Sequence, residues 1–271
     1  MDKIRIFAYI ITTVFVIGAA FPHYILLVNS FKSASEILTN PVSIPFNPRL
    51  TNFIEVITHY RFHNYMLNSL KIISIALPLI IVVGLMAGYS LARLKPKGSA
   101  VIMSLLLIGL STPAFLYIVP LYSLMRNLHL TNNLLGLVPI YTAIYSPLAT
   151  FILYSIMLQL PPSIEEAARL DGASELRILV NIISPLILSS IKTVALLLFV
   201  FMWNEFLFAF VFLSSADLRT TPLAFMFFVR ERGLELNSIF AAGVLSIIPV
   251  LVFYPIFRRE VARGLAMVYK G

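Results

Sequence analysis

Six long apolar runs dominate this chain and limit what it can fold into. Each is close to the roughly 20 residues that an α-helix needs to cross a bilayer, and five of the six contain no Asp, Glu, Lys or Arg. Charged residues make up 12% of the chain, about half the share in a soluble domain. We therefore predict a multi-pass, all-α membrane protein with six transmembrane helices. The runs are Ile6–Phe31, Ile72–Leu91, Ala100–Met125, Leu134–Leu160, Pro185–Leu213 and Ser238–Phe257.

The distribution of Lys and Arg predicts the orientation of these helices, because cytoplasmic segments of membrane proteins are enriched in both residues. With both termini in the cytoplasm, the inner segments hold twelve of the 20 Lys and Arg residues. The net charge of +8 then indicates anchoring to anionic lipid at the inner face rather than nucleic-acid binding. The first run is too long for the apolar core of a signal peptide, so we expect it to be retained. The inner residues are Lys3, Arg5, Arg93, Lys95, Lys97, Arg169, Arg177, Lys192, Arg258, Arg259, Arg263 and Lys270.

A polar segment, residues 161–185, separates the fourth and fifth runs. Pro161-Pro162 ends the preceding helix, and Ser163 with Glu166 matches the S-x-x-E capping box that begins a helix. Gly172 should end that helix, because glycine adopts the left-handed conformation at little cost. We predict a helix, a sharp turn and a second helix that lie across the cytoplasmic surface.

The second of these helices is expected to start at Ser174 and to place Leu176, Val180 and Ile183 on one face. Pro185 then suits the first turn of the next membrane helix. Two interpretations of the segment stay open at this level. It is either a solvated linker on the membrane surface or a knob that fits a cleft in another protein.

The wording of the segment resembles the cytoplasmic coupling loop, or EAA motif, of ABC importer permeases. Glu165-Glu166-Ala167-Ala168 is followed by Asp171-Gly172-Ala173 and later by Pro185. From Asn68 onward the chain is similar to the smaller permease subunit of the carbohydrate-uptake, maltose-type family. Ser184 and Ser189 stand where that family commonly has Leu and a second Pro, which concerns helix packing more than docking. The other matching pieces are Asn68-Ser69-Leu70, Gly88-Tyr89-Ser90-Leu91-Ala92-Arg93, Pro120-Leu121-Tyr122, Leu135-Gly136-Leu137, Trp203-Asn204-Glu205-Phe206 and Phe257-Arg258-Arg259.

The resemblance implies a type I ABC importer permease fold that forms a solute pore with a homologous permease. It also implies two ATP-binding ABC subunits, an external solute-binding protein and a place in a prokaryotic plasma or inner membrane. The chain has no G-x-x-x-x-G-K-[ST] phosphate loop, so we expect the ATPase activity on a partner and no enzyme activity here. The residues implied to couple to that ATPase are Glu165, Glu166, Ala167, Ala168, Asp171, Gly172 and Pro185.

The resemblance also divides the chain. Residues 1–66 are expected to form the first membrane helix and an external loop, residues 67–258 the permease core, and residues 259–271 a cytoplasmic tail. The imported solute is expected to be a sugar or oligosaccharide, with a polyol, a phosphodiester or a peptide as the alternative. An ion-coupled secondary transporter would show inverted repeats and broken midplane helices, and neither is visible in the sequence.

Two further clusters bear on the solute path and on metals. Glu205 is the only carboxylate inside an apolar run, and such acids usually face a cavity or a partner. With Asn204, it either lines a substrate path or forms an interhelical hydrogen bond. Glu55, His59 and His63 have a spacing that can hold Zn²⁺ on a helix. Nothing nearby supplies a fourth ligand, so we expect no metal and no cofactor.

Overall fold

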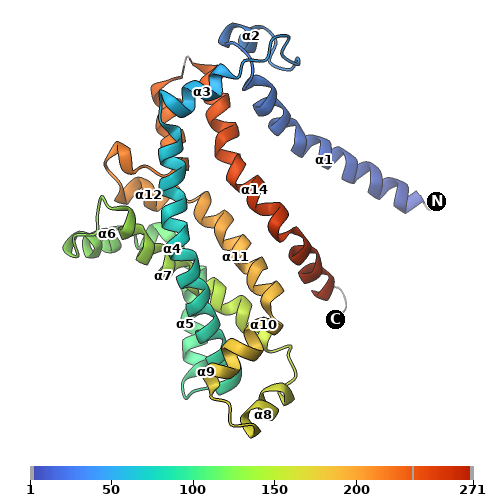
Figure 1. Ribbon diagram of the computed structural model, residues 1–271, viewed down its shortest axis with the longest axis vertical. Coiled ribbons are helices and arrows are strands. Elements are labelled where there is room, and N and C mark those ends of the chain that lie inside the picture. The colour runs from blue at the N-terminus through green and yellow to red at the C-terminus, as the bar shows by residue number, and fades with distance from the viewer. Residues whose placement is uncertain (1–2, 234, 269–271) are drawn as a thin grey trace. The chain divides into compact units, whose positions relative to one another are not determined.

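The structure, a computed structural model, describes the backbone of residues 3–233 and 235–268 and the side chains from residue 4 to residue 254 apart from residue 234. Every regular element in that part of the chain is helical, which confirms the all-α prediction. The chain divides into two compact units (Figure 1). Unit 1 contains residues 1–66 and 221–249, and unit 2 contains residues 67–220 and 250–271. In the tail predicted at 259–271, residues 269–271 lie outside the described residues.

Unit 1 is built around a small apolar core. Val56 and Phe62 pack there with Phe228, and three further core residues, Ala241, Ala242 and Leu245, come from the last helix. The helices that lie within the unit are α1 (Lys3–Asn29), α2 (Ala34–Thr39), α3 (Thr51–Thr58) and α13 (Thr221–Glu231), while α4 (Phe62–Tyr89) and α14 (Leu236–Val268) begin in it and continue into unit 2.

Hydrogen bonds tie the polar segments of unit 1 together. The side-chain amide of Asn52 is buried and donates to the backbone oxygens of Ser30 and Lys32, both at 2.9 Å. Tyr60 donates a 2.6 Å hydrogen bond to Glu235. That bond is the largest of the causes that raise the pKa of Tyr60 to about 12, so the phenol remains a donor at neutral pH.

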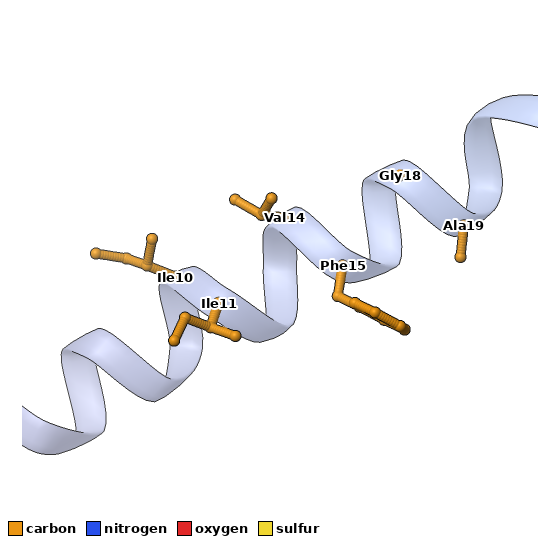
Figure 2. A pocket seen from close by; sticks show the side chains of 6 residues that line it. All are labelled: Ile10, Ile11, Val14, Phe15, Gly18 and Ala19. Carbon is orange, nitrogen blue, oxygen red and sulfur yellow. The ribbon is translucent and has the colours of Figure 1, made fainter.

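Helix α1 presents apolar side chains around its whole circumference. None of the residues in its most apolar 18-residue window is buried. This pattern is typical of a helix that is surrounded by lipid or packs against another protein. Figure 2 shows one shallow hollow on this helix, and all of the residues that line it come from α1 itself. They are Ile10, Ile11, Val14, Phe15, Gly18 and Ala19.

Unit 2 carries most of the remaining helices. Within it, α4 packs closely on α7. The distances at two glycines of α4 show this: a Cβ added at Gly84 would lie 2.9 Å from the Cβ of Ala149, and one added at Gly88 would lie 3.0 Å from the backbone nitrogen of Tyr154. Small residues at such points let helix backbones approach closely. The elements are a π-helical turn η1 (Ser90–Leu94), α5 (Ser99–Ser111), η2 (Ala114–Leu116), α6 (Ile118–Asn127), α7 (Leu134–Met157), α8 (Ser163–Leu170), α9 (Glu175–Ile178), a second π-helical turn η3 (Leu179–Ile183), α10 (Ser184–Leu186), α11 (Leu188–Trp203), α12 (Leu207–Phe212) and η4 (Ala216–Leu218).

Four helices in the described residues are long and apolar enough to cross a membrane, and a fifth crossing is counted if a bent pair of helices forms one span. The four are Ile4–Asn29, Phe62–Leu94, Leu134–Met157 and Leu236–Tyr254, and the bent pair is Glu175–Leu186 with Leu188–Trp203, at 81°. The protein is therefore a multi-pass membrane protein.

Two predicted membrane helices are broken rather than continuous. The third run, Ala100–Met125, is divided between α5 and α6, because Thr112 takes an extended conformation before Pro113. A residue that precedes proline is disfavoured in the helical conformation. The fifth run is interrupted at Ile187 and again between α11 and α12, around Glu205.

Candidate functional site: the loop between α7 and α11

The loop that carries the EAA-like wording forms α8 and α9, which lie at the lower end of unit 2 in Figure 1. The expected capping box is wrong, because Ser163 is already the first helical residue. Pro162 occupies the N-cap position without any side-chain cap. Its carbonyl oxygen accepts from the backbone nitrogens of Glu165 and Glu166, at 3.0 and 3.1 Å. The fixed φ of proline suits the start of a helix, so the turn begins before the serine.

The sharp turn is confirmed at Gly172, which has a φ of +81°. The backbone nitrogen of Ala173 donates to the carbonyl of Ala168, and that of Gly172 donates to the carbonyl of Arg169, both at 3.0 Å. This pair of bonds defines the Schellman motif that ends many helices. The side chain of Ser174 then accepts from the backbone nitrogen of Arg177 and caps α9.

The apolar face predicted for the second helix is wrong in part. Leu176 and Val180 are exposed, while Ile178 and Ile183 are fully buried. The cause is the π-helical turn η3, which follows α9 directly. A π-turn uses i→i+5 hydrogen bonds and adds residues to the turn, so side chains spaced for an α-helix no longer share a face.

Glu165 is buried inside the loop rather than offered at its surface. One carboxylate oxygen lies 2.6 Å from the Nε of Arg93, and the two side chains are 2% and 8% exposed. Arg93 belongs to η1, at the end of α4, and its Nη2 also donates to the carbonyl of Leu160 at 2.9 Å. The charge of Glu165 is therefore neutralised within the chain, and its side chain joins α8 to the end of α4.

Three more side chains extend this ion pair into a network. Arg169 forms a two-pronged contact with Glu175, through Nε at 2.7 Å and Nη2 at 3.1 Å. This contact is the largest cause that raises the pKa of Arg169. The second oxygen of Glu175 accepts a 2.6 Å hydrogen bond from Tyr89 of α4, and Arg169 also lies 3.8 Å from Glu165. Tyr89, Arg93, Glu165, Arg169 and Glu175, here called the loop network, thus connect α4, α8 and α9.

The outer face of the loop is exposed and mixed in character. The exposed residues include Glu166, Ala167, Asp171 and Pro185, whereas Ala168, on the inner side of α8, is buried. The large apolar side chains of Leu170, Leu176 and Val180 are 90%, 62% and 55% exposed. Exposed apolar side chains grouped with charges are typical of a surface that binds another protein.

Glu205 lies at the break between α11 and α12 and is buried. Its carboxylate accepts a 2.6 Å hydrogen bond from the hydroxyl of Tyr141 on α7. It also accepts from the backbone nitrogens of Phe208 and Ala209, at 2.7 and 3.2 Å. These bonds cap the start of α12 and join it to α7. The neighbouring Asn204 is exposed and donates to the carbonyl of Val200.

The cluster of Glu55, His59 and His63 does not share a helix. Helix α3 ends at Thr58, and Arg61 has a left-handed φ of +52° before α4 begins at Phe62. The i, i+4, i+8 spacing therefore does not place the three side chains on one face of a helix. Among the residues that the structure describes, no group of three or more His, Cys, Asp or Glu side chains is placed to hold a metal ion.

Sequence reasoning missed the residues on the inner side of the site. Tyr89 and Arg93 appeared only within a piece that carries the resemblance, with Arg93 also among the inner basic residues, and Glu175 and Tyr141 were not singled out. For Arg93 a signal existed, because the short turn from Arg93 to Lys97 was predicted on the same side of the membrane as the loop. For Tyr141, which lies 64 residues from Glu205, the sequence offered no comparable signal.

Comparison with known proteins agrees with this architecture. A solved bacterial ABC transporter involved in the import of the acidic polysaccharide alginate has a similar fold, with a TM-score of 0.79 at 20% identity over 96% of this chain and 98% of that one. The diacetylchitobiose uptake system permease protein NgcG of Streptomyces coelicolor is 34% identical over 87% of this chain and 79% of its own length. The sulfoquinovosyl glycerol transport system permease protein SmoH of Agrobacterium fabrum is 31% identical, over 95% and 90%. A family model described as the binding-protein-dependent transport system inner membrane component matches residues 80–266, more than half of the chain. The chain therefore belongs to the family of binding-protein-dependent transport system inner membrane components, the ABC importer permeases.

Proposed function

We propose that the chain is one permease subunit of an ATP-driven importer for a sugar or oligosaccharide. The observation that carries the proposal is the loop between α7 and α11, which has an inner side held by the loop network and an exposed outer face. The family match supports a transport role for the whole core. The relatives from Streptomyces and Agrobacterium are named for the transport of a disaccharide and of a sugar glycoside, respectively. These names support a saccharide as the solute.

The exposed face of the loop is the proposed docking site for a cytoplasmic ATPase. Glu166 offers its carboxylate to a basic residue of that partner, and Leu170, Leu176 and Val180 offer apolar contact. The small side chain of Ala167 keeps the exposed face of α8 slim enough to enter a cleft, Ala168 packs on the inner side, and the Gly172 turn fixes the angle between the two short helices. Closure of the ATPase around ATP would then move the loop and drive alternating access.

The proposed assembly contains a homologous permease, two ATP-binding subunits and an external binding protein. The family description, which names binding-protein-dependent transport, supports the last of these. We propose six membrane crossings with both termini in the cytoplasm of a prokaryotic cell. In this arrangement α5 and α6 together make the third crossing, because α5 alone has 13 residues and reaches only about 20 Å.

A reconstituted system tests the proposal. The chain, its partner permease, the ATPase and the binding protein are placed in proteoliposomes and supplied with radiolabelled maltotriose, diacetylchitobiose or an alginate oligosaccharide. We expect uptake of at least one saccharide that requires both ATP and the binding protein, and no ATP binding by the isolated chain. Uptake of sorbitol, glycerophosphocholine or a tripeptide alone would favour the non-sugar alternative. Uptake driven by an ion gradient without ATP would contradict the proposal.

A further inference from the structure

The loop network joins the coupling loop to a helix with which it has no short covalent connection. Along the chain, α8 continues from α7 through Leu160 and leads into α9, so both neighbours can be moved through the backbone. Helix α4 lies far earlier in the sequence, and the side chains of Tyr89 and Arg93 link its C-terminal end to α9 and α8. Any force that reaches α4 from the loop therefore has a side-chain route as well as helix packing.

The Arg93–Glu165 ion pair is the part of this network best able to carry force. Both side chains are almost completely buried, and a buried charge that loses its partner is strongly destabilised. Separating the two side chains while both remain buried would therefore be unfavourable. The guanidinium group of Arg93 also donates a hydrogen bond to the carbonyl of Leu160, shortly before α8 begins. It therefore contacts the loop at two points.

The local backbone at Arg93 is specialised for this position. Arg93 lies in the π-helical turn η1, which ends at Leu94 and is followed by Lys95 with a left-handed φ of +45°. Here the wider turn lies at the inner end of α4, where Arg93 meets Glu165 and Leu160.

We propose that Arg93 and Glu165 form a joint that transmits movement of the coupling loop to α4, and that Glu165 serves this joint rather than direct contact with the ATPase. The inference rests on the proposed function, because it assigns a role within ATP-driven transport. Arg93 is a positioning residue, which acts through Glu165 and touches neither ATP nor solute. The exposed Glu166, one residue later, keeps the role of docking charge.

The ratio of saccharide transported to ATP hydrolysed tests this joint, because a residue needed only for folding lowers both rates together. In the reconstituted transporter, Glu165→Gln keeps the shape of the side chain and removes its charge. We expect uptake of the saccharide used by the wild type to fall at least about tenfold. The ATPase should still co-purify and hydrolyse ATP at a rate within about twofold of the wild type. Arg93→Met should behave in the same way, and Lys97→Gln, which removes an exposed charge four residues away, should leave the ratio unchanged.

A covalent link supplies the second arm, since the chain contains no cysteine. The double variant Arg93→Cys, Glu165→Cys should be uncoupled when reduced, and a short bifunctional methanethiosulfonate that bridges the two thiols should restore at least half of the wild-type ratio. A normal ratio in Glu165→Gln, a proportional loss of uptake and ATP hydrolysis, or a bridged protein that is as inactive as the reduced one would each overturn the joint. These outcomes leave the proposed function standing, whereas a wild-type complex without ATP-dependent uptake would remove that function and the joint with it.

Discussion

Tyr141 and Glu205 are joined by a 2.6 Å hydrogen bond that connects α7 to the break before α12. The same carboxylate accepts two backbone N–H groups of α12. Together these three hydrogen bonds hold the start of α12 against α7, which supports a structural role for Glu205. A structural role and a role in the solute path predict different effects on uptake and assembly when the charge of Glu205 or its hydrogen bonds are removed.

We expect Glu205→Gln to retain assembly and near-normal uptake, because the amide oxygen can still accept from the backbone nitrogen of Phe208 and the amide nitrogen can donate to the oxygen of Tyr141, so that only the longer 3.2 Å bond from Ala209 is lost. Glu205→Leu should destabilise the complex, since each buried N–H group left without a partner costs about 1–3 kcal/mol. The measurement is initial uptake rate beside co-purification yield. Full assembly with lost uptake in the Gln variant would instead assign Glu205 a charge-dependent role in the solute path. Tyr141→Phe, which removes one donor, should show a smaller loss than the Leu variant.

The turn at Gly172 should be essential for coupling, whereas a geometrically similar glycine elsewhere should not be. Gly172 and Gly98 have φ values of +81° and +86°, and a Cβ at either would meet nothing within 4 Å. Alanine at each position therefore suffers the same backbone strain, about 1–2 kcal/mol. Gly172→Pro is more severe, because proline fixes φ near −65° and removes the N–H that donates to Arg169.

We expect Gly172→Pro to abolish ATPase co-purification and uptake while membrane insertion persists. Gly172→Asn should retain most activity, because asparagine tolerates the left-handed conformation. Gly98→Ala should match Gly172→Ala in thermal stability but retain the wild-type ATPase yield. Equal losses of ATPase binding in both alanine variants would show that the loop turn has no special part in docking.

Reversing the charge at Glu166 should weaken ATPase binding without disturbing the fold. Glu166 is exposed, so an arginine meets no steric barrier in the chain itself. If the partner offers a basic residue, Glu166→Arg should lower its co-purification at least about tenfold and abolish uptake. Asp217→Arg makes the same charge change at an exposed position outside the loop and should have no effect on the yield. Unchanged ATPase recruitment by Glu166→Arg would contradict docking through this charge.

Local rules predicted the parts of this molecule that depend on neighbouring residues. The apolar runs identified most of the membrane helices, and Gly172 identified the turn, because a left-handed position requires little more than a glycine at a helix end. Membership of the permease family followed from the wording of the loop and is confirmed by the family match. The roles of the individual loop residues and of Asn204 and Glu205 stay predictions.

Features that depend on distant residues or on backbone irregularities were not predictable. The partner of Glu165 is Arg93, 72 residues earlier, and no local spacing connects them. The π-turns at Ser90–Leu94 and Leu179–Ile183 shift the helical register. They have no recognised sequence pattern, so Ile183, the last residue of η3, was expected on the same face as Leu176 and Val180. Pro113 did carry a signal for the break between α5 and α6, because the residue before a proline is disfavoured in the helical conformation.

Close packing of α4 on α7 predicts that Gly84 tolerates no large side chain. A Cβ at Gly84 would lie 2.9 Å from the Cβ of Ala149 and 3.2 Å from its backbone carbon, so relief would require movement of a helix backbone. Gly109 is a matched control, because it also lies within a helix of unit 2 but a Cβ there would meet nothing within 4 Å. We expect Gly84→Leu to lower the stability of the chain by about 1–3 kcal/mol, the usual cost of overpacking. Gly109→Leu should change it by less than about 0.5 kcal/mol. The measurement is the melting temperature of the purified chain in detergent, and equal melting temperatures for the two leucine variants would show that α4 and α7 are not in contact at this point.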